Sequence, residues 1–266
     1  MIHYNVFPGG KKKALTFSYD DGPSNDTRLV ELFNKYGVKG SFHLNGKKYL
    51  ALDDAGLKKI ADTYKGHEIS CHTLNHGWPT LMPDISVVNE IVEDRRILER
   101  IAKYPVIGMS YPFGDYDAKR IEILRNCGIV YSRTVSATNG FGIPHDFMEW
   151  HPTCHHGGAL ALCENFLDDP RQRKYLFYIW GHSYEFDTEE KWEYMEKVVS
   201  MLAGRDDIWY ATNIEIYNYV MAQRSLIVSV DEKTFTNPSS IDVWVERSAN
   251  GVSEILYIPA GKTVTL

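Results

Sequence analysis

The sequence predicts an α/β protein, a deformed (β/α) barrel of about seven strands followed by a small antiparallel β appendage. From Ala14 to about Arg224, short apolar runs alternate with amphipathic helical patterns, and this alternation is typical of a parallel sheet. Asp20, His72 and His182 come directly after predicted strands, where barrels place their active sites. The alternation alone also fits an open doubly wound sheet, but the position of these polar residues favours the barrel.

The predicted elements follow one another in regular order. Apolar residues at helical spacing predict helices, and short apolar runs bounded by turn residues predict strands. The predicted strands are residues 15–19, 41–44, 67–71, 106–111, 129–135, 176–180 and 208–211. The predicted helices are residues 27–36, 53–64, 85–103, 117–126, 160–167, 189–202 and 213–223.

After residue 224 the pattern changes to short alternating strands. Residues 226–230, 241–246 and 254–258 alternate apolar and polar side chains, with turn residues at 237–240 and at Asn250–Gly251. This tail of about 40 residues is too short for a secure independent domain, so we expect it to pack on the barrel. The predicted division is a barrel over residues 1–224 and an appendage over residues 225–266.

Composition excludes several classes of protein. The 266 residues are 44% hydrophobic and 24% charged, as in ordinary globular proteins. A net charge of -6 and a pI of 5.9 argue against nucleic-acid binding. No stretch approaches the roughly 20 apolar residues that a membrane span needs. Four cysteines without CxxC spacing indicate neither a disulfide framework nor a structural zinc site. The first residues lack a signal-peptide pattern, which predicts a cytoplasmic protein, or a secreted one whose leader has been trimmed.

Two segments carry the residues that suggest chemistry. An apolar run ends in the adjacent carboxylates Asp20 and Asp21, a pattern that a simple strand end also explains. His72 and His76 are four residues apart, and on a helical turn they would share one face, which suits a zinc-class metal. Two histidines and one aspartate leave coordination positions open, and the second aspartate is then free to act as a base. These residues together predict a hydrolase.

Three motifs in order resemble those of the polysaccharide deacetylases, carbohydrate esterase family four. The family motif T-F-D-D-G-P is matched with a small variation by Phe17-Ser18-Tyr19-Asp20-Asp21-Gly22-Pro23. The motif H-[ST]-x-x-H is matched by His72-Thr73-Leu74-Asn75-His76, and I-x-x-H by Ile179-Trp180-Gly181-His182. The resemblance covers roughly residues 10–220.

The resemblance implies a divalent metal held by Asp21, His72 and His76, with Asp20 as base and His182 as acid. A histidine with a pKa near 6.5 is suited to returning a proton to a leaving group. Zinc is the expected ion, and cobalt, manganese and nickel suit the same ligands.

Residues 111–114, Tyr-Pro-Phe-Gly, correspond to the third motif of the family, R-x-P-[YF]-G. There the resemblance implies that the backbone N–H of Phe113 stabilises the oxyanion. The family arginine, which orients the catalytic aspartate, is replaced by Ser110, and the fourth motif is absent in register. Arg133 on the next strand is the candidate to replace that arginine; a surface or core-edge position is the alternative.

Further residues are candidates for substrate binding: Tyr111, Pro112, Trp180, Tyr184 and Arg133. Trp78, Trp180 and Tyr184 follow the motifs closely and could stack on a sugar ring or plug the barrel core. Residues 150–156, rich in histidine and interrupted by proline, are predicted to form an irregular loop.

These observations predict a metal-dependent hydrolase that removes acetyl groups from N-acetylated or O-acetylated carbohydrate and releases acetate. One alternative is a hydrolase of a different amide, such as a cyclic imide or ureide. A second is a catalytically silent carbohydrate-binding protein, which the loss of the family arginine at Ser110 would favour.

Overall fold

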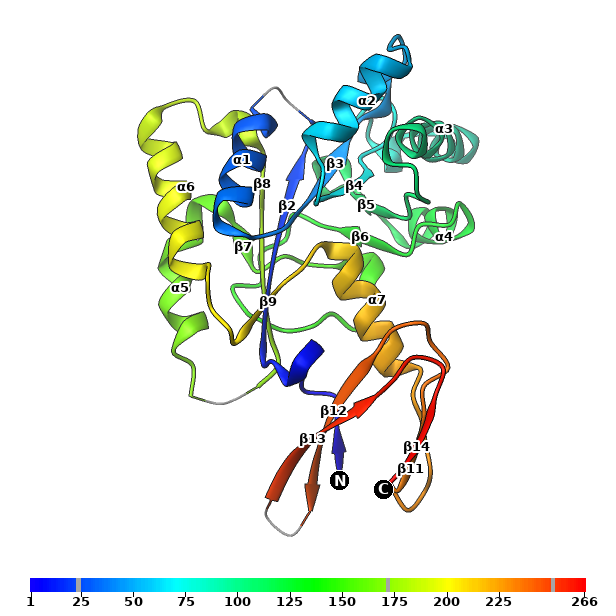
Figure 1. Ribbon diagram of the computed structural model, residues 1–266. Helices are drawn as coiled ribbons and strands as arrows, with labels where there is room; N and C mark the ends of the chain where they lie inside the picture. The colour runs from blue at the N-terminus through cyan, green and yellow to red at the C-terminus, as the bar shows by residue number, and fades with distance from the viewer. Residues whose placement is uncertain (23–24, 171–172, 250–251) are drawn as a thin grey trace.

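A parallel sheet forms the centre of the structure and bends into a barrel. The computed structural model describes residues 1–22, 25–170, 173–249 and 252–266. Within these ranges the sheet has eight strands in the order β6-β5-β4-β3-β2-β8-β7, with β9 paired to β2 (Figure 1). The strands are β2 (Lys13–Asp20), β3 (Gly40–Leu44), β4 (Glu68–Cys71), β5 (Gly108–Ser110), β6 (Tyr131–Arg133), β7 (Cys154–His155), β8 (Tyr175–Gly181) and β9 (Ile208–Tyr210).

The segment of residues 150–155 closes the ring. Arg133 of β6 forms a parallel bridge with Trp150, and β7 pairs with β8 through Cys154 and Ile179. The ring is irregular because β2 pairs with β9 along its first half and with β3 along its second half. These pairings confirm the predicted deformed barrel.

The prediction of an irregular loop over residues 150–156 was wrong, because β7 lies within it. The strand is only two residues long and follows Pro152, so neither apolar alternation nor β propensity reveals it. Its pairing depends on β8, which lies more than 20 residues further along the chain.

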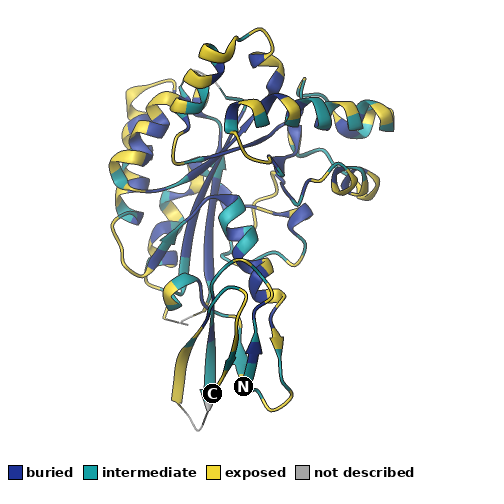
Figure 2. Ribbon diagram, turned by 45° about the vertical axis from the view of Figure 1, so that its right-hand side comes forward, coloured by how far each residue is buried: buried dark blue, intermediate teal, exposed yellow. Residues whose placement is uncertain are grey.

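Helices cover the outside of the sheet. Figure 2 shows buried residues on the sides that face the strands and exposed residues on the outer sides. The helices are α1 (Asp26–Tyr36), α2 (Asp54–Thr63), α3 (Asp84–Ala102), α4 (Ala118–Asn126), α5 (Leu160–Leu167), α6 (Glu189–Leu202) and α7 (Asn213–Arg224). Each agrees with a predicted helix to within about two residues, the accuracy with which helix ends are defined.

Several helices begin at a side-chain cap that the sequence supplies. Asp53 accepts a hydrogen bond from the N–H of Gly56 ahead of α2, and Asp117 caps α4 in the same way. Thr212 and Glu215 form a reciprocal capping box at the start of α7. These local signals fix where the helices start.

The alternation of side chains along β2 positions the site. Leu15, Phe17 and Tyr19 belong to the core between strands and helices. Successive side chains of a strand point to opposite faces, so Asp20 points toward the barrel interior. It does so at the carboxyl end of the strand, where neighbouring parallel strands also end.

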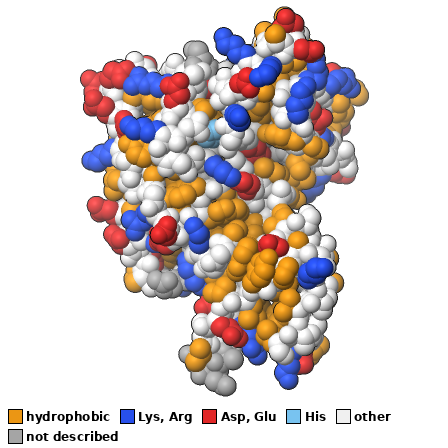
Figure 3. Space-filling model, viewed as in Figure 1, with side chains coloured by type: hydrophobic (Ala, Val, Ile, Leu, Met, Phe, Trp, Pro, Cys, Tyr) orange, Lys and Arg blue, Asp and Glu red, His pale blue; other side chains and the backbone are white. Residues whose placement is uncertain are grey.

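The C-terminal residues form a small antiparallel β appendage, as predicted, and it consists of two sheets, one of which includes the N-terminal strand β1. One has the order β1-β12-β13 and the other β10-β11-β14, and a separate apolar core lies between them. The strands are β1 (Ile2–His3), β10 (Ile227–Val228), β11 (Thr234–Thr236), β12 (Val243–Ala249), β13 (Val252–Ile258) and β14 (Thr263–Thr265). The predicted turn at Asn250–Gly251 lies outside the described residues. On the face shown in Figure 3, apolar side chains gather over this appendage.

The appendage docks on α7. The amide of Gln223 donates to the carbonyl of Trp244 at 2.8 Å, and the N–H of Trp244 donates to the hydroxyl of Tyr219 at 3.3 Å. The strand β1 joins the appendage sheet through β12, so the two ends of the chain lie near one another (Figure 1). No helix in the described ranges is long and apolar enough to span a membrane.

Candidate active site

Asp20 and Asp21 lie at the carboxyl end of β2, where the chain turns sharply. Asp21 has a φ of 75°, and its N–H donates a 2.9 Å hydrogen bond to a carbonyl of β3. Gly22 has a φ of 62°, and a Cβ there would lie 2.6 Å from the hydroxyl of Tyr49, so only glycine fits. Asp20 is buried, whereas 21% of the Asp21 side chain is exposed. Pro23, the end of this motif, lies outside the described residues.

His72 and His76 lie in the loop that follows β4. The prediction that they share one face of a helical turn was wrong, because the loop is irregular and both Thr73 and His76 have positive φ values. The amide of Asn45 donates to the carbonyls of His72 and Thr73 at 2.8 and 3.0 Å. The N–H of His72 donates to the carboxylate of Asp94 at 3.1 Å. Side chains thus satisfy the backbone groups that a helix would pair internally.

The loop nevertheless brings both imidazoles to Asp21. The Nε2 atoms of His72 and His76 lie 3.8 and 3.5 Å from Oδ1 of Asp21, and one ligand atom from each residue fits within 4.8 Å. Partial exposure of Asp21 and His76 leaves one side of this group open. The three residues therefore fit a divalent ion that keeps positions for water and substrate.

Ser110 fixes the orientation of His72. The Nδ1 atom of His72 lies 2.9 Å from the carbonyl oxygen of Ser110 and 2.7 Å from its hydroxyl. Donation from Nδ1 to the carbonyl leaves the Nε2 lone pair facing Asp21, which is the arrangement that metal-ligating histidines use. Burial lowers the pKa of His72 to about 4, against the opposing effect of Asp20 and Asp21. The imidazole is therefore neutral, as a ligand must be.

Asp20 is held by two neighbours inside the barrel. A guanidinium N–H of Arg133 donates to Oδ2, and the hydroxyl of Ser110 donates to Oδ1 at 3.0 Å. Arg133 is itself fully buried, with the ring of Trp180 4.3 Å from its guanidinium carbon. Burial raises the pKa of Asp20, but Arg133 and His72 outweigh this effect and hold it well below its usual range. Asp20 is therefore an ionised carboxylate.

His182 follows β8 and forms a short hydrogen bond to a carboxylate. Its Nδ1 atom lies 2.6 Å from Oε1 of Glu185, three residues further along the same 3-10 turn. Burial lowers the pKa of His182, but Glu185 and Asp20 outweigh it, and the pKa is raised. Sequence reasoning missed Glu185. The His-x-x-Glu spacing is the signal that could have indicated it, because residues three apart meet on a helical turn.

Residues 8–132 match the family model for polysaccharide deacetylase. This segment, just under half of the chain, is that of a polysaccharide deacetylase domain. The matched segment contains Asp20, Asp21, His72 and His76, and the structure adds His182 from beyond it. The sequence expectation of carbohydrate esterase family four is thus confirmed.

Curated members of the family are similar over part of their length. A peptidoglycan-N-acetylglucosamine deacetylase of Bacillus cereus is 27% identical over 96 residues, 36% of this chain and 34% of that protein. A chitin deacetylase of Pestalotiopsis sp is 27% identical over 116 residues, 43% of this chain and 38% of that protein. The alignments therefore span less than half of these curated deacetylases.

Solved structures of polysaccharide deacetylases share the fold. A polysaccharide deacetylase from Mycobacterium smegmatis has a TM-score of 0.64 at 17% identity, covering 84% of this chain and 96% of its own. An acetyl xylan esterase of family four from Clostridium thermocellum, in complex with cobalt, has a TM-score of 0.53 at 17% identity. The match covers 77% of this chain and 90% of the esterase chain. A mutant of a family-four pseudoenzyme with restored enzymatic activity has a TM-score of 0.54 at 16% identity. The match covers 80% of this chain and 70% of the mutant chain.

The third family motif lies beside His76. Phe113 has a φ of 59°, and its ring meets the ring of His76 edge to face at 4.5 Å. Trp78 stacks on Phe113 with ring centroids 4.1 Å apart. Tyr184 stacks on His182 at 4.9 Å. About half of each of Trp78, Phe113 and Tyr184 is exposed, so aromatic surface lies next to His76 and His182.

Other candidates for substrate binding lie deeper than expected. Tyr111 is buried, and its hydroxyl donates to the carbonyl of Met148 at 2.9 Å. Pro112 is also buried. Arg133 reaches the site, as considered from the sequence, but it contacts Asp20 from within the barrel, with Trp180 packed against it. Tyr111, Pro112 and Arg133 are therefore buried, whereas Tyr184 is about half exposed.

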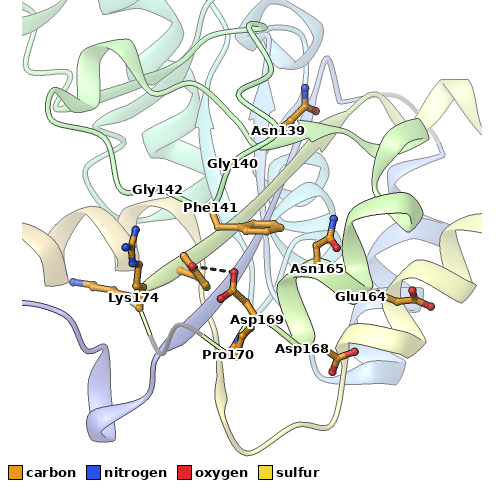
Figure 4. A pocket seen from close by; sticks show the side chains of 12 residues that line it. Asn139, Gly140, Phe141, Gly142, Glu164, Asn165, Asp168, Asp169, Pro170 and Lys174 are labelled. Carbon is orange, nitrogen blue, oxygen red and sulfur yellow. Dashed lines mark hydrogen bonds between the residues drawn. The ribbon is translucent and has the colours of Figure 1, made fainter.

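A wide cavity lies elsewhere on the molecule. It has a volume of about 810 Å³ and is bounded by residues 139–142, the end of α5 and the residues that lead into β8. Figure 4 shows Phe141 and Asp169 lining it, with Asp169 bonded to Tyr175 at 3.0 Å. None of the predicted site residues lines this cavity, so its size does not mark it as the active site.

Proposed function

We propose that this chain is a metal-dependent hydrolase that removes acetyl groups from N-acetylated or O-acetylated carbohydrate and releases acetate. The observation that carries the proposal is the convergence of Asp21, His72 and His76 next to Asp20 and His182. The names of the curated relatives, deacetylases of peptidoglycan N-acetylglucosamine and of chitin, support the substrate class. The cobalt complex of an acetyl xylan esterase supports a divalent ion.

Asp21, His72 and His76 would hold the ion, and Asp20 would serve as the base. When bound, the ion polarises the acyl carbonyl and lowers the pKa of water. Asp20 is ionised, and each of its two carboxylate oxygens accepts one hydrogen bond. Each oxygen therefore has a second acceptor position to which the attacking water can donate. Arg133 and Ser110 fix its orientation, so the carboxylate is positioned before substrate arrives.

His182 would return the proton to the leaving nitrogen or oxygen. Its Nδ1 atom is occupied by Glu185, which leaves Nε2 for the leaving group. Because the pKa of His182 is raised, a larger fraction of the imidazole carries a proton near neutral pH. The aromatic surfaces of Trp78 and Tyr184 would contact the sugar ring on either side of this chemistry.

The two alternatives differ from this proposal in what they predict for acetate. A hydrolase of cyclic imides or ureides would open its substrate without releasing acetate. A silent binding protein would retain glycan affinity without turnover. One of the solved structures that share the fold is a mutant of a family-four pseudoenzyme. Retention of the ligands, the carboxylate and the histidine in one place favours turnover.

A pair of variants tests the assigned roles. Asp20→Asn keeps the three ligands and loses the base, so we expect it to bind zinc but to release acetate at least about 100-fold more slowly. His76→Ala removes a ligand, so both the bound zinc and the turnover should be lost. His145→Ala, at an exposed position, serves as the matched control and should retain both. Near-normal acetate release by Asp20→Asn would contradict the assignment of the base.

A further inference from the structure

The carboxylate of Glu185 contacts two more imidazoles besides His182. The Nε2 atoms of His155 and His156 lie 3.0 and 3.2 Å from Oε2 of Glu185, while His182 bonds to Oε1. His155 and His156 come from the end of β7 and the 3-10 turn that follows it. This group of His155, His156 and Glu185, here the Glu185 cluster, is separate from Asp21, His72 and His76.

The spacing of the Glu185 cluster suits a metal ion. Ligand atoms about 2.1 Å from one ion lie roughly 3.0–3.4 Å apart when their angles are between octahedral and tetrahedral. The nitrogen-to-oxygen distances of 3.0 and 3.2 Å fall in this range, and one ligand atom of each residue lies within 4.8 Å of the others. Two histidines and a glutamate are a ligand set that zinc enzymes use.

The Glu185 cluster borders a cavity of about 300 Å³, whose other walls include Phe186, Lys191 and Tyr194. The side chains of His155 and Glu185 are 37% and 30% exposed. An ion can therefore enter from solvent, and the cavity has room for the water molecules that would complete its coordination.

His156 is held in place before any ion arrives. Its ring stacks on Tyr19 at 5.8 Å and packs against Phe186 at 4.5 Å. Gly181 makes room for it, since a Cβ there would lie 2.0 Å from Nδ1 of His156. Burial lowers the pKa of His156, despite the opposing hydrogen bond to Glu185, so the ring can be the neutral ligand that a metal needs.

His155 has to release the proton on Nε2 before it can bind an ion. Its Nδ1 atom accepts a 3.3 Å hydrogen bond from the N–H of Gly157, so in the absence of an ion the Nε2 atom carries the proton and donates it toward Glu185. Coordination through Nε2 requires that proton to leave, and the bond from Gly157 is then lost. The bond is long, which keeps this cost small.

We propose that His155, His156 and Glu185 form a second divalent-cation site of the zinc class, one carboxylate away from His182. Oε1 of Glu185 bonds to His182, and Oε2 would bind the ion. The positive charge of the ion would then disfavour the protonated form of His182, which is the form that acts as an acid. Excess zinc should therefore slow acetate release, a consequence that rests on the proposed function. The site itself does not depend on that function.

Zinc stoichiometry tests the site, measured by equilibrium dialysis and elemental analysis of the purified full chain. The wild type should bind two equivalents at saturation, and His155→Gln and His76→Ala one each, with the double variant binding none. Glu185→Gln is the second variant if His155→Gln does not fold, and it should lose the same equivalent. In acetate-release assays, the wild type should be inhibited as zinc rises beyond the first equivalent, and His155→Gln should lose this inhibition.

The outcomes separate this proposal from the proposed function. One equivalent in the wild type, kept in His155→Gln and lost in His76→Ala, would overturn the second site and leave the first. Two equivalents in both the wild type and His155→Gln would place the second ion elsewhere and also overturn it. One equivalent kept in His76→Ala and lost in His155→Gln would uphold the Glu185 cluster and refute the assigned catalytic centre.

Discussion

Asp20 combines deep burial with a negative charge, and a buried charge is stable only when it is paired. Arg133 supplies the positive partner and Ser110 a second hydrogen bond, both from strands that neighbour one another in the sheet. The position where the family has arginine is thus filled by a small hydroxyl, and the arginine comes from β6 instead. This exchange keeps the pairing, and the Ser110 hydroxyl contacts His72 as well as Asp20.

The pairing can be measured as a coupling free energy. Arg133→Met leaves Asp20 as an unpaired buried charge, so we expect a loss of about 3–5 kcal/mol in the free energy of unfolding. Asp20→Asn combined with Arg133→Met should cost less than the sum of the single changes, because no charge remains unpaired. Arg125→Met, which breaks an exposed pair with Asp146, is the control and should cost no more than about 1 kcal/mol. Strict additivity in urea unfolding would refute the coupling.

Glu185 is bonded to His182, the proposed acid. It raises the pKa of His182, so the protonated acid persists to higher pH and is lost as pH rises through that raised value. Glu185→Gln removes the negative charge, and the alkaline limb of kcat for acetate release should move to lower pH. Glu193→Gln, exposed on α6, should leave the limb in place. An unchanged limb in Glu185→Gln would show that His182 is not the acid whose protonation limits the rate.

At the scale of elements, the helices and most strands of the barrel were predicted well, including the three-residue strands β5, β6 and β9, whereas β7 and the loop of His72 and His76 were not. The helices and the major strands depend on local periodicity and caps such as Asp53 and Thr212, which a sequence displays. The strand β7 and the loop of His72 and His76 depend on partners far along the chain. The proposed ligand residues could be named from their motifs, and Arg133 could be named as a candidate, but its bond to Asp20 from inside the barrel needed the fold.

The turn after β2 is the element on which the ligand geometry depends most. Gly22→Ala adds a Cβ at a φ of 62° and 2.6 Å from the hydroxyl of Tyr49, so the turn has to shift. We expect a loss of about 1–3 kcal/mol in the free energy of unfolding, together with weaker zinc binding through Asp21. Gly142→Ala, where a Cβ would meet open space, is the control and should change neither quantity appreciably. Unchanged zinc affinity in Gly22→Ala would mean that the turn does not position Asp21.

At the scale of the whole molecule, a barrel closed by irregular pairings brings the candidate catalytic residues together at one end. Asp20, His72 and His182 come from three strands that end there, and the fold is shared with solved deacetylases at 17% identity or less. The appendage docks on α7 through Gln223 and Trp244, and it shares an antiparallel sheet with the N-terminal strand. The division near residue 224 stays a prediction.

Acetate release before and after chelation tests the central claim most directly. The protein is stripped of metal, assayed on N-acetylglucosamine oligomers and acetylated xylan, and assayed again after one equivalent of zinc or cobalt is restored. We predict no acetate from the stripped protein and acetate from at least one of these substrates once the ion returns. Bound metal without acetate from any of them would contradict the deacetylase assignment and favour a different amide or a binding role.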